Sequence, residues 1–146
     1  MDESRFKRPE SVLVVVFTVA GEVLLLKRSD HPDFWQSVTG SLKWGESSAQ
    51  AARRELREET GLEYGEAIED WHREFTFEIL EMWRYRFAPG VIRNREHLFS
   101  LELEARPPIH LNPREHSTFC WKSREAAAEQ VWSWTNRQAI LDVVPG

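Results

Sequence analysis

The chain has 146 residues, among them seven tryptophans and one cysteine, and its 24 acidic side chains outnumber 19 basic ones to give a net charge of −5. This length predicts a single domain over residues 1–146, and the ordinary proportions of charged and apolar residues exclude a disordered or fibrous chain. The acidic balance disfavours nucleic-acid binding, which needs a basic surface, while a lone cysteine excludes an internal disulfide and indicates a reducing, cytoplasmic setting.

A valine-rich, uncharged run at residues 12–20 follows three basic residues near the start of the chain. This order superficially resembles a short secretory signal, but the run is less than half of the roughly 20 residues that cross a bilayer. A buried strand explains it better, and we expect no membrane association. The turn at Gly21-Glu22 and a second apolar run, 23–26, then predict a β-hairpin.

A helix is the next strong prediction, after a loop and a brief strand in residues 29–40. Ser47 or Ser48 can cap its first turn, and apolar residues at spacings of three and four give it one face that packs on a sheet. The helix is expected to run to about Thr60, because Gly61 follows at the position where helices usually end.

The hydrophobic period changes to two beyond Glu74, which is typical of half-buried antiparallel strands. Aromatic and polar residues alternate over 74–80 and again over 83–87, so both segments are predicted strands, followed by a turn at Pro89-Gly90. The remaining predicted elements are strands at 98–103 and 119–121 and helices at 124–131 and 136–144. This order predicts an α/β fold of the α+β kind, a mixed sheet with helices packed on it.

Three glutamates, Glu55, Glu58 and Glu59, lie on one face of the predicted helix, within about 100° of arc. Like charges at these spacings repel, and the C-terminal end of a helix disfavours negative charge. A hard divalent cation would resolve this conflict, because Mg²⁺ prefers carboxylate oxygens. The alternative is a solvated helix, since arginines are interleaved and Arg54 can pair with Glu58 at i, i+4.

The wider spacing favours the cation. Nine positions follow the pattern of the Nudix box: Gly40, Glu46, Arg54, Glu55, Leu56, Glu58, Glu59, Gly61 and Leu62. The odds of a chance match in a chain of this length are of order 10⁻⁷ or less from average composition. The segment therefore resembles the Nudix hydrolase family, which implies an α/β/α sandwich with a mixed sheet and a loop-helix-loop catalytic motif.

The resemblance also implies a role for individual residues. Family members hydrolyse a diphosphate linked to another moiety by water attack on phosphorus, with Mg²⁺ or Mn²⁺ as cofactor. Carried over by position, the catalytic residues would be Arg54, Glu55, Glu58, Glu59 and Glu115, and the metal ligands Glu55, Glu58, Glu59 and Glu115. Arg54 would hold the glutamates by hydrogen bonds, and Glu46 would support it. Glu115 lies outside the box, and as a single loop glutamate it has surface charge as its alternative reading.

Stretches outside the box resemble a bacterial branch of the family that removes pyrophosphate from dihydroneopterin triphosphate in folate synthesis. They are residues 6–9, 33–40, 77–79, 86–91, 115–116 and 134–140. The substrate contacts implied by this resemblance are Lys7, Arg28, Trp35, Thr39, Gly40, Phe77, Glu78, Ile79, Leu80 and Ser133. Lys7 and Arg28 could face a triphosphate, and the aromatic rings of Trp35, Phe77, Trp132 and Trp134 could cover a flat pterin. Each tryptophan has a place in the core as its alternative.

Two other functions stay open. One is a pyrophosphohydrolase of oxidised or deoxy nucleoside triphosphates, because purines and pterins share their size and edge chemistry. The other is a non-catalytic Nudix-fold nucleotide sensor, which the intact box disfavours. The expected partner is a small-molecule triphosphate, and the sequence is compatible with a monomer or a homodimer. Lys43 and Trp44 receive no role from the sequence.

Overall fold

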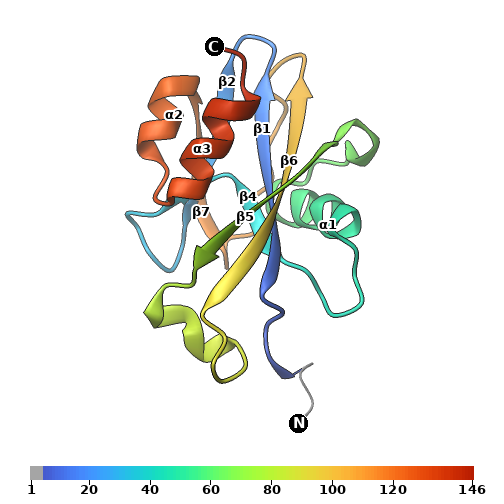
Figure 1. Ribbon diagram of the computed structural model, residues 1–146. Coiled ribbons are helices and arrows are strands. Elements are labelled where there is room, and N and C mark those ends of the chain that lie inside the picture. The colour runs from blue at the N-terminus through green and yellow to red at the C-terminus, as the bar shows by residue number, and fades with distance from the viewer. Residues whose placement is uncertain (1–4) are drawn as a thin grey trace.

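One seven-stranded mixed sheet, with helices on both faces, forms the frame of the protein in the computed structural model, which describes residues 5–146 (Figure 1). The strands are β1 (Glu10–Thr18), β2 (Glu22–Arg28), β3 (Trp35–Gln36), β4 (Val38–Ser41), β5 (Glu69–Glu78), β6 (Arg93–Leu103) and β7 (His116–Ser123). The helices are α1 (Ser48–Thr60), α2 (Arg124–Gln130) and α3 (Trp134–Val143), with 3₁₀ turns η2 (Gly65–Ala67) and η3 (Glu81–Arg86). The predicted α/β/α sandwich is confirmed. No helix within residues 5–146 combines the length and apolar character needed to span a membrane.

Strand β1 lies at the centre and explains why the first apolar run is continuous. Its side chains alternate between two cores: Val12 and Val14 pack with α1, whereas Leu13 and Val15 pack with α2 and α3. A strand that is covered on both faces gains from an apolar residue at every position. Figure 1 shows this arrangement, with α1 on one side of the sheet and α2 and α3 on the other.

The two edges of β1 are used differently. Strand β6 pairs with β1 in parallel over the whole length of β1. On the other edge, β4 pairs with residues 11–14, and β2 pairs with β1 only near Phe17. Strand β2 therefore diverges from β1 and pairs instead with β3 and β7. The residues at this divergence, Arg28, Gln36 and Thr39, line the large cavity described below.

Helix α1 begins and ends where the sequence predicts. The Ser47 hydroxyl accepts a hydrogen bond from the Gln50 amide, and the Gln50 side chain accepts one from the Ser47 amide, which makes a capping box. Gly61 ends the helix in the left-handed conformation, at φ 76°. Such a conformation favours glycine, and it turns the chain away directly after Glu59.

The predicted strand at 83–87 is wrong, because this segment belongs to the 3₁₀ turn η3. Side chains three residues apart lie above one another in a 3₁₀ helix. Leu80, Trp83 and Arg86 have this spacing, and all three line the cavity. The sequence of this segment fits both the period of two of a strand and the period of three of a 3₁₀ helix. Packing around the cavity favours the 3₁₀ helix.

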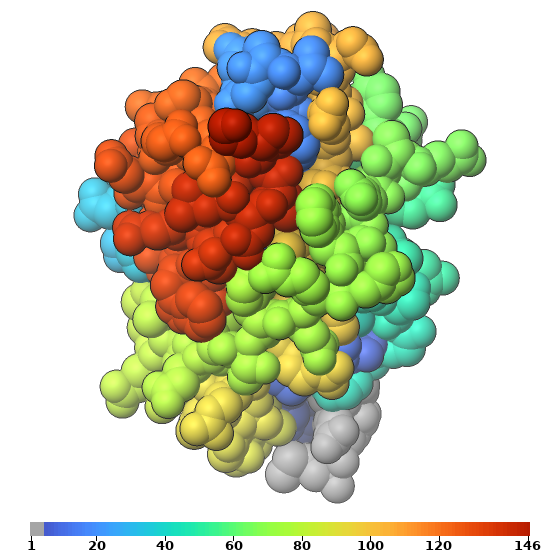
Figure 2. Space-filling view, turned by 45° about the horizontal axis from the view of Figure 1, so that its top comes forward, coloured from blue at the N-terminus to red at the C-terminus, as the bar shows by residue number. Residues whose placement is uncertain are grey.

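The other predicted elements are confirmed with shifted ends. Strand β5 starts five residues earlier than Glu74, and its pairing with β6 is irregular between Asp70 and Glu74. His72 has φ 52° within this bulge. Figure 2 shows β5 beside α3, and Arg73 of β5 pairs with Asp142 of α3 at 2.9 Å. Strands β6 and β7 also extend beyond their predicted ranges, because side chains that alternate less regularly still complete the ladders.

Candidate active site

A cavity of about 670 Å³ lies between the N-terminal segment, β4, α1, η3, β6 and the start of α3. This volume is within the range of small-molecule sites. Eight of the ten predicted substrate contacts line it: Lys7, Arg28, Thr39, Gly40, Phe77, Ile79, Leu80 and Ser133. Their role as contacts stays a prediction, but the structure brings them to one place.

Trp35 and Glu78, the other two predicted contacts, are not among the residues that line the cavity. Successive side chains of a strand point to opposite faces. Gln36 takes the cavity side of β3, so Trp35 packs against the core beneath α2 and α3. In the same way, Phe77 and Ile79 face the cavity and Glu78 does not. The sequence resemblance therefore indicated segments that reach the cavity, but it did not indicate which face each of their residues takes.

Aromatic rings form one wall of the cavity. Trp132 and Trp83 both line it and meet edge to face, with their centroids 5.6 Å apart. Phe34 stacks on Trp132 at 4.6 Å, and the Arg28 guanidinium lies over the Trp83 ring at 4.5 Å. Trp134, in contrast, is exposed, and its ring makes an edge contact with Phe75. Trp83 was missed because its segment was predicted to be a strand.

Arg54 organises the outer carboxylates of α1. It donates two hydrogen bonds of 2.8 Å to Glu46 and one of 2.7 Å to Glu55. It also pairs with Glu58 at 3.1 Å, as the i, i+4 spacing predicts. The hydrogen bonds from Arg54 lower the pKa of Glu46 to about 2. Glu58 is exposed, so the three glutamates of the helix occupy different environments.

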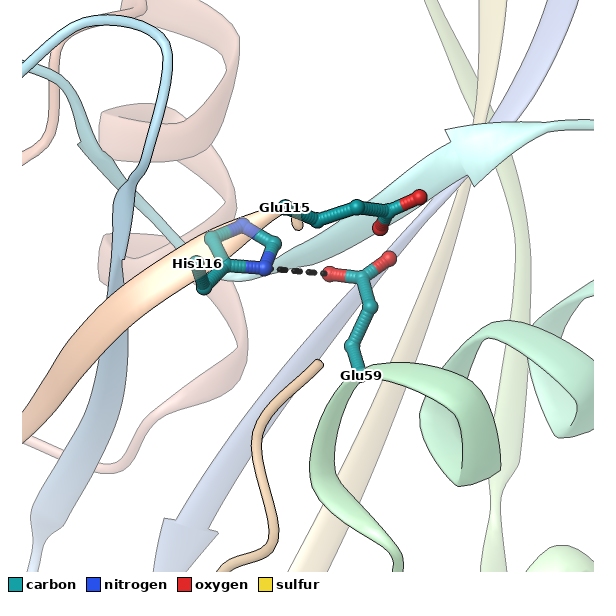
Figure 3. A group of neighbouring side chains, drawn as sticks. All are labelled: Glu59, Glu115 and His116. Carbon is teal, nitrogen blue, oxygen red and sulfur yellow. Dashed lines mark ion pairs between the residues drawn. The ribbon is translucent and has the colours of Figure 1, made fainter. Parts of the chain in front are cut away.

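Glu59 lies fully buried at the end of α1, and neither carboxylate oxygen has a hydrogen-bond partner among the described residues. Figure 3 shows that Glu115 and His116, from the start of β7, approach it. One ligand atom from each of these three residues lies within 4.8 Å of the others. Burial raises the pKa of Glu59, and the neighbouring carboxylates of Glu55 and Glu115 raise it further.

These carboxylates fit a hard divalent cation. Buried oxygens without a donor are costly, and carboxylate oxygens are what Mg²⁺ and Mn²⁺ bind. Gly40 supports the arrangement, because a Cβ atom at this position would collide with the carboxylate of Glu55. Glu55, Glu59 and Glu115 would hold the ion. Glu58 is held by Arg54 on the exposed side of the helix.

A chain of three contacts leads from the aromatic wall to Glu59. The Trp132 indole donates to the Gln36 side-chain oxygen at 3.1 Å, so the Gln36 amino group faces His116 Nε2 at 3.1 Å. Nε2 must then accept, which places the ring proton on Nδ1. This Nδ1 lies 3.8 Å from the Glu59 Oε1 atom (Figure 3). Burial and the charge of Arg28 lower the pKa of His116 to about 4, so the ring is neutral at pH 7.

A neutral His116 with its proton on Nδ1 faces Glu59 from beyond hydrogen-bond distance, and it cannot bind a cation through that nitrogen. His116 therefore lies beside the Glu59 carboxylate without offering Nδ1 as a metal ligand. Sequence reasoning missed both Gln36 and His116. The only signal was the position of His116 directly after Glu115, and nothing in the sequence joins His116 to Gln36.

Cationic side chains gather opposite the carboxylates. Loss of water around Lys7 and the nearby guanidinium groups of Arg86 and Arg28 lower the Lys7 pKa, while Glu55 and Glu115 raise it. This places positive and negative groups across one cavity. Arg86 was not predicted as a contact. Lysine and arginine in such a setting are suited to phosphate oxygens.

The N-terminal segment is fixed in place by the loop before α1. The Trp44 indole donates to the Phe6 carbonyl at 2.8 Å, and the Arg8 guanidinium donates to the carbonyls of Lys43 and Glu46. Trp44 and the Lys43 carbonyl, which the sequence left without a role, thus hold the segment that carries Lys7. Lys7 is further held because its amide donates to the Arg86 carbonyl at 2.8 Å.

Comparison with known proteins agrees with this geometry. The NUDIX domain model matches residues 7–143. The chain belongs to the Nudix hydrolase family. It is 44% identical to "Dihydroneopterin triphosphate diphosphatase" of Escherichia coli (strain K12), over 99% of this chain and 97% of that protein. It is 41% identical to the protein of the same name from Haemophilus influenzae, over 93% of this chain and 87% of the other.

Among solved structures, the E. coli dihydroneopterin triphosphate pyrophosphohydrolase superposes on this Nudix chain with a TM-score of 0.90 and 44% identity, and the match covers 95% of this chain and 97% of that one. A Nudix protein of Listeria monocytogenes, at 22% identity and a TM-score of 0.77, shares the fold and covers 94% and 92% of the two chains. Members of the family generally depend on a divalent metal, which agrees with the acidic cluster at Glu59.

Proposed function

We propose that this Nudix hydrolase converts 7,8-dihydroneopterin triphosphate to its monophosphate and pyrophosphate, with Mg²⁺ as its cofactor and Mn²⁺ as a substitute. The observation that carries the proposal is that Glu55 and Glu115, which line a cavity with an aromatic wall, approach the buried carboxylate of Glu59. The likeness over nearly the whole length to enzymes that carry this name supports the choice of substrate.

The divalent cation, when bound, neutralises phosphate oxygens and lowers the pKa of a water molecule. The chain supplies the rest of the site. Lys7, Arg28 and Arg86 bind oxygens of the triphosphate and so position it in the site. Arg54 holds the Glu55 carboxylate in one orientation by a hydrogen bond, and the His116 Nδ1 atom faces Glu59 at 3.8 Å.

In the proposed reaction, water forms a new bond to phosphorus while one phosphoanhydride bond breaks. The products are the monophosphate and pyrophosphate: the product that contains the attacked phosphorus keeps the water oxygen, and the other product is the leaving group. The proton of the water passes to a carboxylate of the cluster. Most of the acceleration then comes from positioning and from stabilisation of charge, because the phosphorus chemistry needs little covalent help from the protein.

A side-by-side assay tests this proposal. The purified protein is given Mg²⁺ and either dihydroneopterin triphosphate or a common nucleoside triphosphate, and kcat/KM is measured for each. We expect the pterin compound to have the largest kcat/KM and pyrophosphate to be the product released. A larger value for a nucleotide assigns the protein to nucleotide hydrolysis, release of single phosphates contradicts the reaction, and no turnover of any compound assigns it a sensor role.

A further inference from the structure

A second buried carboxylate lies in the cavity, on a different element from the metal-binding cluster. Glu96 of β6 lines the cavity and is only 5% exposed. It follows the alternation of the strand, in which Leu98 faces α2 and α3 and Phe99 faces α1. Glu96 thus points to the side of the sheet on which α3 begins, where the Thr135 side chain forms a hydrogen bond with it.

One oxygen of Glu96, Oε1, has no hydrogen-bond partner among residues 5–146. No described lysine, arginine or histidine forms an ion pair with the group, although Glu10 on the neighbouring strand pairs with both Arg8 and His97. Burial raises the pKa of Glu96 to about 7. A carboxylate with only a structural role would have a donor for each oxygen, because an unsatisfied buried acceptor is costly.

The polar neighbours on the cavity floor are already engaged with each other. The Asn94 amide donates to the Ser11 hydroxyl at 2.7 Å. Asn136 bonds to both the backbone amide and the hydroxyl of Ser37, at 2.8 and 2.9 Å. These groups use one another as partners, and they leave Oε1 of the cavity-lining Glu96 buried without a donor. A donor must therefore come from the ligand.

We propose that Glu96 recognises the heterocycle of the substrate by accepting two hydrogen bonds from a ring N–H and the adjacent exocyclic amino group. Its ligand class is thus a 2-amino-4-oxo-pyrimidine ring, as in pterin and guanine. This inference rests on the proposed function, because it assigns the cavity floor to the base and the carboxylate end to the phosphates. Oε1 takes one N–H, and the other oxygen takes the second beside Thr135, since each oxygen has two lone pairs.

This pairing excludes other rings by their hydrogen-bond pattern. Adenine and cytosine place a donor beside an acceptor on the corresponding edge, so one oxygen of Glu96 would face a lone pair. Lumazine carries an oxygen where pterin carries its amino group and would meet Glu96 with an acceptor. A site built around a buried polar group rejects a ligand that leaves this group unpaired much more strongly than an apolar pocket does.

The test measures binding of pterin and of lumazine, both without phosphates, by fluorescence titration in the absence of metal. Wild-type protein should bind pterin at least about 30-fold more tightly than lumazine. In Glu96→Gln the amide would direct N–H groups at a donor, and this ratio should fall to within about 3-fold. Glu102→Gln is the matched control, because Glu102 is an exposed glutamate of the same strand; its ratio should equal that of the wild type.

Two features keep this test decisive. The wild-type ratio does not depend on whether a variant folds, so equal affinities for pterin and lumazine, or no binding of either up to their solubility limits, overturn the inference. Mn²⁺ affinity of Glu96→Gln, which should be unchanged, shows whether that variant retains its structure. Failure of the proposed function is distinguishable: wild-type protein would then prefer pterin through Glu96 but would not hydrolyse dihydroneopterin triphosphate.

Discussion

The carboxylate just before the Nudix helix and the buried carboxylates at the cavity differ in their partners, and their pKa values shift in opposite directions. In the loop before α1, Glu46 is held by two hydrogen bonds from Arg54, and these lower its pKa to about 2. Glu59, which is buried beside the cavity, and Glu96, which lines it, have no lysine or arginine partner among residues 5–146, and their pKa values are raised. Paired carboxylates thus stabilise the fold, whereas unpaired ones cost free energy until a ligand or ion arrives.

The largest effect is expected on kcat, when the unpaired carboxylate of Glu59 is removed. Glu59→Gln should lower kcat by at least about 10²-fold, which is about 3 kcal/mol of barrier, because it removes a carboxylate from the metal cluster. Tm should not fall, since the amide carries no buried charge. Glu63→Gln, an exposed glutamate just beyond the helix, is the control. Unchanged turnover in Glu59→Gln would remove Glu59 from the metal site.

Glu96 should make wild-type stability depend on pH. Its folded pKa of about 7 exceeds the ordinary value of 4.5, so the folded state favours the protonated carboxyl group. The stability of the wild type relative to Glu96→Gln is therefore greatest below pH 4.5 and is lost as the pH rises through 7. Between pH 4.5 and 8 this loss should be about 3 kcal/mol, measured by urea unfolding. Parallel pH profiles of the two proteins would show that Glu96 is not strained by its burial.

Arg54 should show the converse, a cost in stability when a pair is broken. Arg54→Ala should lower the free energy of unfolding by about 2 kcal/mol, less than for a fully buried pair because water can reach Glu46 once Arg54 is gone. The contribution of the Glu46 pair is present above pH 4.5 and is lost as the pH falls towards 2. Arg57→Ala, an exposed arginine of the same helix, should change stability by less than about 0.5 kcal/mol. Equal losses in both variants would contradict the pairing.

The smallest effect is expected on metal affinity, when Trp132, which reaches Glu59 only through Gln36 and His116, is changed. Trp132→Phe removes the indole donor that orients Gln36, so His116 is less firmly held toward Glu59. Mn²⁺ affinity should fall by about 10-fold or less. Trp134→Phe, at an exposed tryptophan, should leave it unchanged, and ¹⁵N shifts of His116 should place the ring proton on Nδ1 in the wild type. A proton on Nε2 would overturn the assignment.

Much of the fold could be predicted because periodicity and caps are local. The apolar run in β1, the cap at Ser47 and the stop at Gly61 each follow from a few neighbouring residues. The segment 83–87 failed because it supports two periods, and only the cavity decides between them. Strand ends shifted for a similar reason, since pairing with a distant strand extends a ladder beyond its alternating residues.

Residues of the candidate site could be predicted where they belong to a motif with fixed spacing in the sequence. The box located Arg54, Glu55 and Glu59 on one helix, and the flanking resemblance located Lys7 and most of the cavity wall. The sequence did not indicate Gln36 or Glu96. Both are ordinary polar residues on strands, and only their partners, about 40 to 100 positions away in the sequence, indicate a role. The partner of Glu96 is Thr135, and the partners of Gln36 are His116 and Trp132.

The fixed N-terminal segment has a practical consequence for work with this protein. Phe6 and Lys7 are held by Trp44 and Arg86, and they form part of the cavity wall. A shortened start that removes them would open the site, and a bulky fusion there would crowd the substrate entrance. Figure 1 places the first described residues and the C-terminus at opposite ends of the molecule. Affinity tags and surface attachment therefore belong at Gly146, which lies beside Arg124 at the opposite end of the molecule from Phe6 and Lys7.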